Sequence, residues 1–452
     1  MASDTQTDES ISVQALRVGM FVRLDSAWIT HPFPLNNFKI GNPEQIATIR
    51  ALGVASVRWD PSLSDNEAPS TAPGLIAAPV QAVAPAPAAA PAQAVTPTPA
   101  AALAQAVAPA TPAAAPFVGA AAVPRAQRLA RQREAQAECE SRFTNSVTAG
   151  RQAAGRIASD PERAKVEFES LTKSLLGEIV TQEDICISLI RDAVGNNAST
   201  HAQNVAVLAL LLGRKFGLSQ AELLDLGMGA LLHDIGKIGI AERLHHPDEY
   251  FTALEIKAYE EHVAFGLVRG QQMGLSAGVM QIIAQHHEMA DGSGFPLKLG
   301  SERMGHAARI VAMVNAFDTL CNPQVSKRAV TPHEALAQMF TQGKRRFDTS
   351  LLGAFIKLIG VYPAGTTVQL TDERLAVVIS VNSAHPLKPR VLVHDVKVPR
   401  EEALAIDIGD EPGLGIRRSI KPQHLPVPAL HYLAPRQRMA YYFDPVLVEP
   451  AA

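Results

Sequence analysis

Apolar and polar positions alternate with different periods along this chain, and the changes of period predict separate segments. Residues 8–62 combine short strand-like runs, such as Met20 to Leu24, with one helix-like stretch from Pro43 to Leu52. Strand and helix periods within so short a segment predict a small α+β domain. Residues 63–123 are dominated by alanine and proline, which predicts a semi-stiff linker and not a folded core.

The rest of the chain begins with helical periods and ends with alternating ones. Residues 124–176 carry Arg, Glu, Gln and Ala at helical spacing, which predicts a helical connector that is either solvated or dimerising. Residues 177–360 contain apolar helical runs and predict an all-α domain. From 361 to 452 we expect a small β-rich extension, with strands at 366–370, 375–381 and 390–394.

Composition and charge narrow the class of protein. With 452 residues, of which 47% are hydrophobic and 19% charged, the chain has room for more than one core. The formal net charge of −3 argues against a protein that coats nucleic acid. No apolar run is long enough to span a bilayer and the first residues do not resemble a signal peptide, so we expect a cytoplasmic protein. The scattered Cys139, Cys186 and Cys321 predict neither a disulfide framework nor a zinc ribbon.

Histidines are concentrated in one part of the helical domain. Seven of the chain's 14 histidines fall between residues 201 and 287, where four segments place His or Asp beside apolar helical runs. Burying such groups is costly unless they are paired or bound to a metal. The adjacent imidazole and carboxylate of His233 and Asp234 can bind one metal, or the carboxylate can bridge two, and a metal there can activate water. The pattern favours a metal site over a set of chance core histidines.

The motifs of this region resemble those of a known family. His201, the run from Leu231 to Ile240 (LLHDIGKIGI), the isolated His262 and the run from His286 to Pro296 (HHEMADGSGFP) resemble the HD-GYP domain, a branch of the HD phosphohydrolases. The resemblance implies an all-α, HD-type helical bundle with a centre of two or three metal ions, usually iron or manganese. It also implies hydrolysis of the bacterial messenger cyclic di-GMP to pGpG or GMP.

Carried over onto this sequence, the family's functional residues fall on matching positions. Asp234 is expected to bridge two metals, and Lys237 to stabilise charge on the scissile phosphate, although a lysine at a helix end is usually just exposed. Asp318 matches the family and suggests a structural role or one behind the ligands. The expected metal ligands are His201, His233, Asp234, His262, His286 and His287.

The loop after the paired histidines has two interpretations. Two glycines and a proline within six residues form a turn in any case. In the family the same loop is also proposed as a contact surface for diguanylate cyclase (GGDEF) domains. The residues concerned are Asp291, Gly292, Gly294, Phe295 and Pro296.

Several positions depart from the family's pattern. Asn315 stands where the family has an aspartate ligand, and Asn197 where trinuclear members have a glutamate. Neutral amides are weaker ligands, so we expect two metals and not three, with the first held loosely. Phe295 replaces a tyrosine and Gln324 an arginine, which removes a bidentate phosphate contact. The expected substrate-binding residues are Lys237, Phe295 and Lys327.

The segment before the linker resembles a second family. Leu16 to Val22, Trp28 and His31 to Phe33 are similar to the DUF3391 domain, which precedes some HD-GYP domains and whose function is not established. A regulatory or partner-binding module and a mere folding appendage both remain open.

Three functions remain open from the sequence. The leading hypothesis is a metal-dependent phosphodiesterase acting on cyclic di-GMP, with a possible homodimer formed through the helical connector. The alternative is a catalytically degenerate protein that binds the messenger or a partner without turnover, which Asn197, Asn315, Phe295 and Gln324 favour. A phosphohydrolase for another nucleotide is the third.

Overall fold

A computed structural model gives the fold of two compact units, Met1–Pro109 and Ala110–Ala452. The residues that it describes are 9–24, 37–40, 43–51, 54, 56–61, 64, 124–180, 185–190, 197–323, 328–341, 345–383, 385–435 and 439–445.

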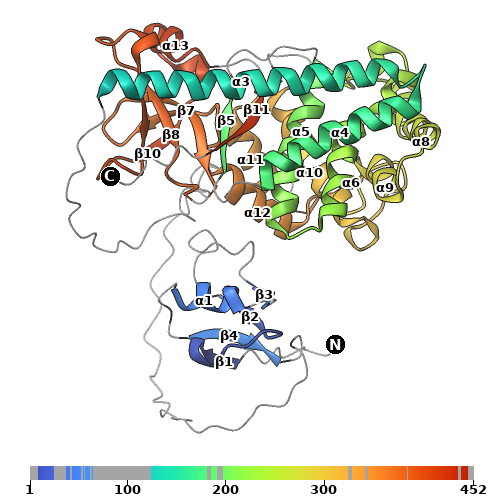
Figure 1. Cartoon of the computed structure of the whole chain (residues 1–452), viewed down its shortest axis with the longest axis horizontal. Coiled ribbons are helices and arrows are strands. Elements are labelled where there is room, and N and C mark those ends of the chain that lie inside the picture. Colours follow the sequence, from blue (N-terminus) through green and yellow to red (C-terminus); the bar gives the residue numbers. More distant parts are fainter. Residues whose placement is uncertain are drawn as a thin grey trace, which may run out of the picture. The chain divides into compact units, whose positions relative to one another are not determined.

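The N-terminal unit is a four-stranded antiparallel sheet with one helix (Figure 1). Val22 and Ile49 are fully buried in its core, and the predicted α+β domain is confirmed. Trp28, His31 to Phe33 and nearly all of the linker lie outside the described residues. In the spatial order β1-β4-β2-β3, the strands are β1 (Glu9–Ser12), β4 (Ser56–Asp60), β2 (Phe21–Arg23) and β3 (Asn37–Lys39); the 3₁₀ helix η1 (Val13–Ala15) follows β1, and the helix is α1 (Pro43–Ala51).

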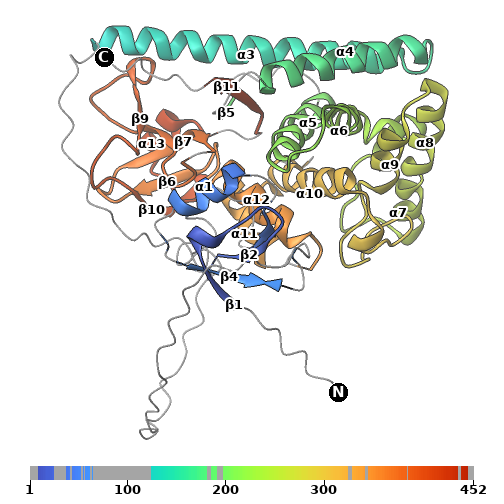
Figure 2. The same cartoon turned by 60° about the horizontal axis from the view of Figure 1, so that its bottom comes forward.

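Two long helices, α3 (Arg125–Arg156) and α4 (Pro161–Val180), occupy the segment predicted to be helical. They pack against each other, and α3 runs along both the helical bundle and the C-terminal sheet (Figures 1 and 2). At the sheet end, Gln132 Nε2 donates to the carbonyl of Ala403 at 3.2 Å. Further along α3, Phe143 is fully buried. The connector is therefore an integral part of this unit.

Within the range 177–360, which was predicted to be all-α, the residues from Asn197 onward form a helical bundle around α5, whose residues Val205 to Leu210 are fully buried. The same range also contains the strand β5 (Ile185–Leu189), which joins the C-terminal sheet. Ser219 and Thr252 each begin a helix with a reciprocal capping box, which satisfies amide groups at the helix start. The elements are α5 (Asn197–Lys215), α6 (Gln220–Leu232), η3 (Ile235–Gly239), η4 (Glu242–Leu244), α7 (Ala253–Glu260), α8 (His262–Met273), α9 (Ala277–Gln285), η5 (Ser301–Arg303), α10 (His306–Cys321), α11 (Pro332–Thr341) and α12 (Thr349–Ile359).

The C-terminal region completes an antiparallel sheet that begins before the bundle. The three predicted strands are confirmed as β6 (Thr367–Leu370), β7 (Leu375–Asn382) and β8 (Arg390–Val393). The sheet runs in the order β10-β6-β7-β5-β11, with β8 pairing β7 and β9. The other elements are β5 (Ile185–Leu189), β9 (Ala405–Asp407), β10 (Ile416–Ser419), β11 (Tyr441–Pro445), η7 (Arg400–Glu402), η8 (Pro422–His424) and α13 (Val427–Leu433).

The sheet ties the end of the chain to the start of the bundle. β5 precedes α5 in the chain, and it pairs with β7 on one side and with β11 on the other. Tyr441, Tyr442 and Phe443 of β11 are buried, so the aromatic residues near the end of the chain pack into the interior of this unit.

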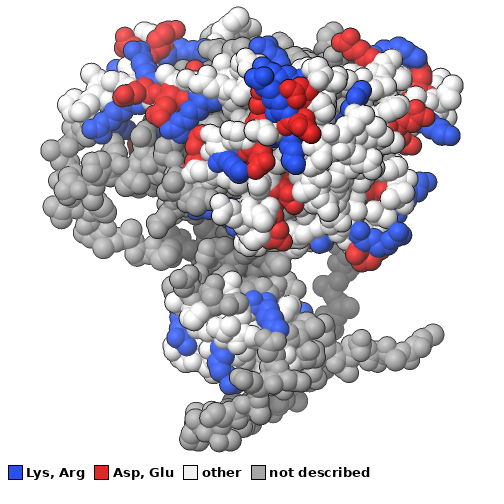
Figure 3. All heavy atoms as spheres, turned by 45° about the vertical axis from the view of Figure 1, so that its right-hand side comes forward, with Lys and Arg blue, Asp and Glu red and all other residues white. Residues whose placement is uncertain are grey.

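The surface of this unit mixes both signs of charge. On the face drawn in Figure 3, lysine and arginine side chains alternate with aspartate and glutamate. On α4, for example, Lys173 pairs with Glu169 at 2.6 Å and Arg163 with Glu167 at 3.1 Å. No described helix combines the length and the apolar character needed to cross a membrane.

Candidate metal centre

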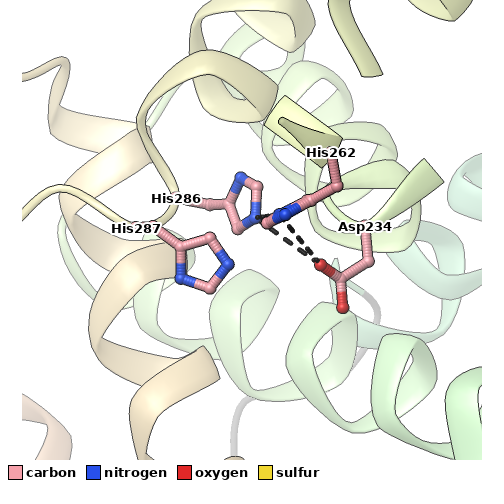
Figure 4. A group of neighbouring side chains, drawn as sticks. All are labelled: Asp234, His262, His286 and His287. Atoms are coloured by element: carbon pink, nitrogen blue, oxygen red, sulfur yellow. Dashed lines mark hydrogen bonds and ion pairs between the residues drawn. The ribbon is translucent and has the colours of Figure 1, made fainter. Parts of the chain in front are cut away.

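The six residues predicted as metal ligands converge near the ends of four helices of the bundle. They form two groups that share Asp234, and one ligand atom from each residue of a group lies within 4.8 Å of the others. Figure 4 shows the rings of His262 and His286 directed at the carboxylate of Asp234. The groups are Asp234, His262, His286 and His287 in one case, and His201, His233 and Asp234 in the other.

A hydrogen bond from Nδ1 to a backbone carbonyl orients three of these histidines. The last carbonyl groups of a helix have no partner within the helix, so a nearby donor can bind them. His233 Nδ1 lies 2.8 Å from the carbonyl oxygen of Ala230, and His286 Nδ1 lies 2.8 Å from that of Ile283. His262 Nδ1 is 2.6 Å from the carbonyl oxygen of Tyr259. Because a carbonyl only accepts, each Nδ1 carries a proton, which leaves Nε2 of each ring as the atom that can offer a lone pair to a metal.

These lone pairs face one another across the shared carboxylate. The Nε2 atoms of His262 and His286 are 3.3 Å apart, and they lie 3.7 and 3.6 Å from Asp234 Oδ1. That oxygen is buried and has no hydrogen-bond partner among the described residues. Two nitrogen lone pairs and an anionic oxygen repel each other unless a cation lies between them. The donor set therefore fits a divalent metal ion.

The second group has the same form at the other side of Asp234. His201 and His233 bring their Nε2 atoms to within 3.2 Å of each other. His201 Nδ1 donates to Asp318 Oδ2 at 2.6 Å, which leaves Nε2 facing the centre. Burial lowers the pKa of His201, but the hydrogen bond to Asp318 and its charge outweigh that effect and raise it.

Burial keeps most of the imidazoles neutral. Desolvation lowers the pKa of His233, lowers that of His262 to about 4, and lowers that of His287 well below its usual value. Burial alone would raise the pKa of Asp234, but Lys237 and the neighbouring histidines hold it well below the usual range. Neutral imidazoles around an ionised carboxylate are the states in which these groups bind metals.

A glycine lets Asp234 approach His262. Gly236 lies in η3 against α8, and a Cβ atom there would be 1.8 Å from the carbonyl oxygen of His262 and 2.4 Å from the amide nitrogen of Gly266. Both neighbours are backbone atoms and cannot move aside. The glycine of the motif therefore serves close packing of two backbone segments.

Lys237 is held against the carboxylate. Its Nζ donates to Asp234 Oδ2 at 2.6 Å, and its side chain is only 19% exposed, so it is not a free surface lysine. Its Nζ also lies 5.7 Å from the ring centroid of Tyr259. The Tyr259 hydroxyl is 3.1 Å from His287 Nε2. Burial and the charge of Asp234 raise the pKa of Tyr259, which keeps the phenol protonated as a donor.

The loop after His287 presents an aromatic face to the site. Phe295 stacks on His287, with ring centroids 4.4 Å apart and an interplanar angle of 21°. The turn expected on sequence grounds is confirmed: Asp291 Oδ1 accepts from the amide of Ser293 at 3.0 Å, and Gly292 has a φ of 75°. The use of this loop as a surface for a partner protein stays a prediction.

Other predicted positions have different outcomes. Asn315 is buried on α10, one turn before Asp318, and its Oδ1 accepts from the Thr319 hydroxyl at 3.4 Å. Asn197 is the first residue of α5, and its side chain is not described. Lys327, with Gln324, lies outside the described residues. Cys321 is buried, as expected for a small apolar residue.

Some residues around the centre were not singled out from the sequence. Tyr259 lies three residues before His262, a spacing that places both on one face of a helical segment. Glu288 is fully buried and accepts from the amides of Leu297 and Leu299 at 2.6 and 2.8 Å, which fastens the loop. Asn204 follows His201 by three residues and contacts Asp318. Their spacing of three residues from a histidine, which places two side chains on one helix face, is the sequence signal that could have identified Tyr259 and Asn204.

Comparison with known proteins agrees with this arrangement. Residues 184–351 match the family model of the HD domain, and residues 9–164 match that of a domain of unknown function, DUF3391. A cyclic di-GMP phosphodiesterase of Pseudomonas aeruginosa is 28% identical over 249 residues, which cover 53% of this chain and 58% of that protein. The cyclic di-GMP phosphodiesterase response regulator RpfG of Xanthomonas campestris is 30% identical over 210 residues, covering 45% of this chain and 56% of that protein.

A relative with another named substrate is also similar. The 3'3'-cGAMP-specific phosphodiesterase 2 of Vibrio cholerae is 28% identical over 163 residues, which cover 36% of this chain and 31% of that protein. The chain spans only about half the length of the first two relatives, and less of this one.

Proposed function

Because residues 184–351 form an HD domain, a metal-dependent phosphohydrolase fold, we propose that this chain is a metal-dependent phosphodiesterase that hydrolyses cyclic di-GMP. The observation that carries the proposal is the sharing of Asp234 between two groups of histidines, with its Oδ1 buried and without a hydrogen-bond partner among the described residues. A carboxylate in that position fits a bridge between two metal ions.

The proposed cofactors are two divalent ions, iron or manganese, which imidazole and carboxylate ligands both suit. When bound, they would supply an activated water and neutralise charge on the phosphate. The side chains proposed to hold them are His201, His233, Asp234, His262, His286 and His287.

Lys237 is the proposed catalytic partner of this centre. Its ammonium group already lies beside Asp234, so a short movement of its flexible stem would bring Nζ to a phosphoryl oxygen. A cation there stabilises negative charge that builds up during displacement at phosphorus. The contact is stronger in the transition state than in the ground state, which is the condition for a rate effect.

The aromatic side of the site suits a nucleotide. Phe295 is partly exposed and stacks on His287 with one face, so its other face offers an apolar surface on which a purine can stack. The two relatives named as cyclic di-GMP phosphodiesterases support guanine dinucleotide as the substrate class.

Binding without turnover is the second candidate, and Asn315 is the observation that favours it. The side chain is buried, neutral and only one turn from Asp318, so it brings no charge to the position where the family has a carboxylate ligand. A protein with a weakened centre would still present Lys237 and Phe295 to the messenger.

Turnover on defined substrates tests the proposal. The metal-loaded full chain is incubated with cyclic di-GMP, and the products are separated by chromatography. We expect conversion to pGpG or GMP, slowed about 100-fold by Lys237→Ala and unchanged by Lys257→Ala, an exposed lysine of α7. Binding of the messenger without product would favour the second candidate. Faster cleavage of 3'3'-cGAMP than of cyclic di-GMP would contradict cyclic di-GMP as the preferred substrate.

A further inference from the structure

The start of β11 is held by side chains from the helical bundle. The amide of Met439 donates to Asn322 Oδ1 at 2.6 Å, and the amide of Tyr441 donates to Asn204 Oδ1 at 3.0 Å. The carbonyl of Met439 accepts from Asn204 Nδ2 at 2.9 Å and from Asn322 Nδ2 at 2.8 Å. Asn204 on α5 therefore binds Met439 and Tyr441, and Asn322 at the end of α10 binds Met439 through both its amide and its carbonyl group, directly before β11 begins.

The same two amides also hold Asp318. Asn204 Nδ2 donates to Asp318 Oδ1 at 2.7 Å and Asn322 Nδ2 donates to it at 2.9 Å. The other oxygen, Oδ2, accepts from His201 Nδ1 at 2.6 Å. Asp318 and Asn204 are fully buried, so water does not replace these contacts. A continuous set of hydrogen bonds thus connects the strand to a side chain of the candidate centre.

We propose that Asn204 and Asn322 are positioning residues through which the C-terminal strand β11 fixes Asp318 and, with it, the metal-binding orientation of His201. The inference rests on the proposed metal centre. Each asparagine uses both Nδ2 hydrogens, one on Asp318 and one on the carbonyl of Met439, two residues before β11. Removing either partner leaves a buried donor unsatisfied and frees the carboxylate to turn. Groups that orient a ligand in this way change metal affinity by about 10- to 100-fold when lost.

The asparagines and Asp318 orient His201 but none of the other histidines whose orientation is described above. His233, His262 and His286 are oriented by carbonyl groups three residues before each of them, within the helical bundle. None of these contacts involves β11. Disturbing the asparagines should therefore weaken the site of His201 and leave the site of His262 and His286 intact.

Sequence spacing explains how the contacts arise. Asn204 follows His201 by three residues on α5, and Asn322 follows Asp318 by four at the end of α10, so each pair shares a helix face. The strand itself is aligned by β5, where the amide of Ile190 donates to the carbonyl of Ala440 at 2.9 Å.

Titration of the metal-stripped full chain with Mn²⁺ tests the proposal without an activity assay. Asn322 is only partly buried, so Asn322→Ala should fold, and Asn322→Asp keeps the volume while replacing the donor with an acceptor that faces Asp318. We expect both variants to weaken one Mn²⁺ binding step by about tenfold or more and to leave the other step unchanged. Asp318→Asn should weaken the same step, and combining it with Asn322→Ala should add little further loss.

Tyr442→Phe is the matched control. It removes a contact of β11 on the side away from Asp318, where the Tyr442 hydroxyl donates to Glu178 Oε2 at 3.4 Å. This variant should bind Mn²⁺ like the wild type. The inference is overturned if the Asn322 variants bind both ions normally, if they weaken both steps equally, or if Tyr442→Phe has the same effect. A wild-type chain that takes up no Mn²⁺ would overturn the proposed function as well, and this sets the two failures apart.

Discussion

The Nε2 atom of His262 lies 3.3 Å from the Nε2 atom of His286, and both atoms face Asp234 Oδ1. In each ring, Nδ1 donates a hydrogen bond to a backbone carbonyl. The fold therefore directs two ring nitrogens at a buried carboxylate oxygen that has no hydrogen-bond partner among the described residues. A cation bound between these atoms would balance the charge of the carboxylate and satisfy the ring nitrogens.

Asn315→Asp should strengthen metal retention and speed turnover together. The change adds a carboxylate at a buried position one turn from Asp318. Without metal the new charge is buried and repelled by its neighbours, so the stripped variant should unfold at a lower temperature than the wild type. With metal, loss of ions to a chelator should slow by about tenfold. Retention and turnover that both stay at the wild-type level would remove the missing carboxylate as the cause of weak binding.

Tyr259→Phe should raise metal affinity at the site of His287. The hydroxyl lies 3.1 Å from His287 Nε2 and occupies that atom, whichever of the two carries the proton. Removing it deletes a competitor of the metal, and a hydrogen bond of about 1 kcal/mol corresponds to an affinity gain of roughly fivefold. Mn²⁺ titration of the stripped variant measures the change. A loss of affinity would mean that the hydroxyl supports the ligand.

Gly236→Ala should destabilise the protein and empty the centre. A Cβ would meet two backbone atoms of α8, so α8 and η3 must separate, at a cost of about 1–3 kcal/mol or more. Gly177→Ala on α4 is the control, because a Cβ there meets nothing within 4 Å. The free energy of unfolding of the control should rise by about 0.5–1 kcal/mol, because alanine favours the helix more than glycine does. Equal effects of the two changes on melting temperature and metal content would refute the close-packing role.

The metal-free protein should lose stability as the pH falls below about 6.5. A buried histidine whose pKa is lowered on folding binds its proton more tightly in the unfolded chain, so acid favours unfolding. For His262, the fall from 6.5 to about 4 corresponds to roughly 3 kcal/mol, lost progressively across that range. His233 and His287 act in the same direction, while the raised pKa of His201 opposes them. Urea unfolding in chelator at pH 7.5 and pH 5 measures the slope, and a stability that rises toward pH 5 would contradict it.

The sequence predicted the clustering of the six histidine and aspartate side chains better than it predicted the residues around them. His233 and Asp234 are adjacent in the chain, and the other histidines stand in motifs, so their convergence could be expected from the family resemblance. The role of Tyr259 could not, because it depends on the angle at which α7 meets the loop of Phe295.

In the fold, too, the elements with a local sequence pattern were predicted and those that depend on distant contacts were not. The strands at 366–370, 375–381 and 390–394 follow alternating patterns and were predicted nearly to the residue. β5 and β11 were not predicted, because their pairing joins residues more than 250 positions apart and no local pattern reports it. The contacts of Asn204 and Asn322 with Met439 depend on that pairing, and they were missed for the same reason.

Counting the bound metal ions is the most direct test of a centre in which Asp234 is shared by two metal sites. The full chain is purified without oxygen, its metals are counted by mass spectrometry, and Asp234→Asn is compared with Asp248→Asn, an exposed aspartate outside both histidine groups. We expect about two ions per wild-type chain, the same content in Asp248→Asn, and loss of most metal in Asp234→Asn. A wild-type chain without metal, or an Asp234→Asn variant that keeps both ions, would contradict the shared-carboxylate centre.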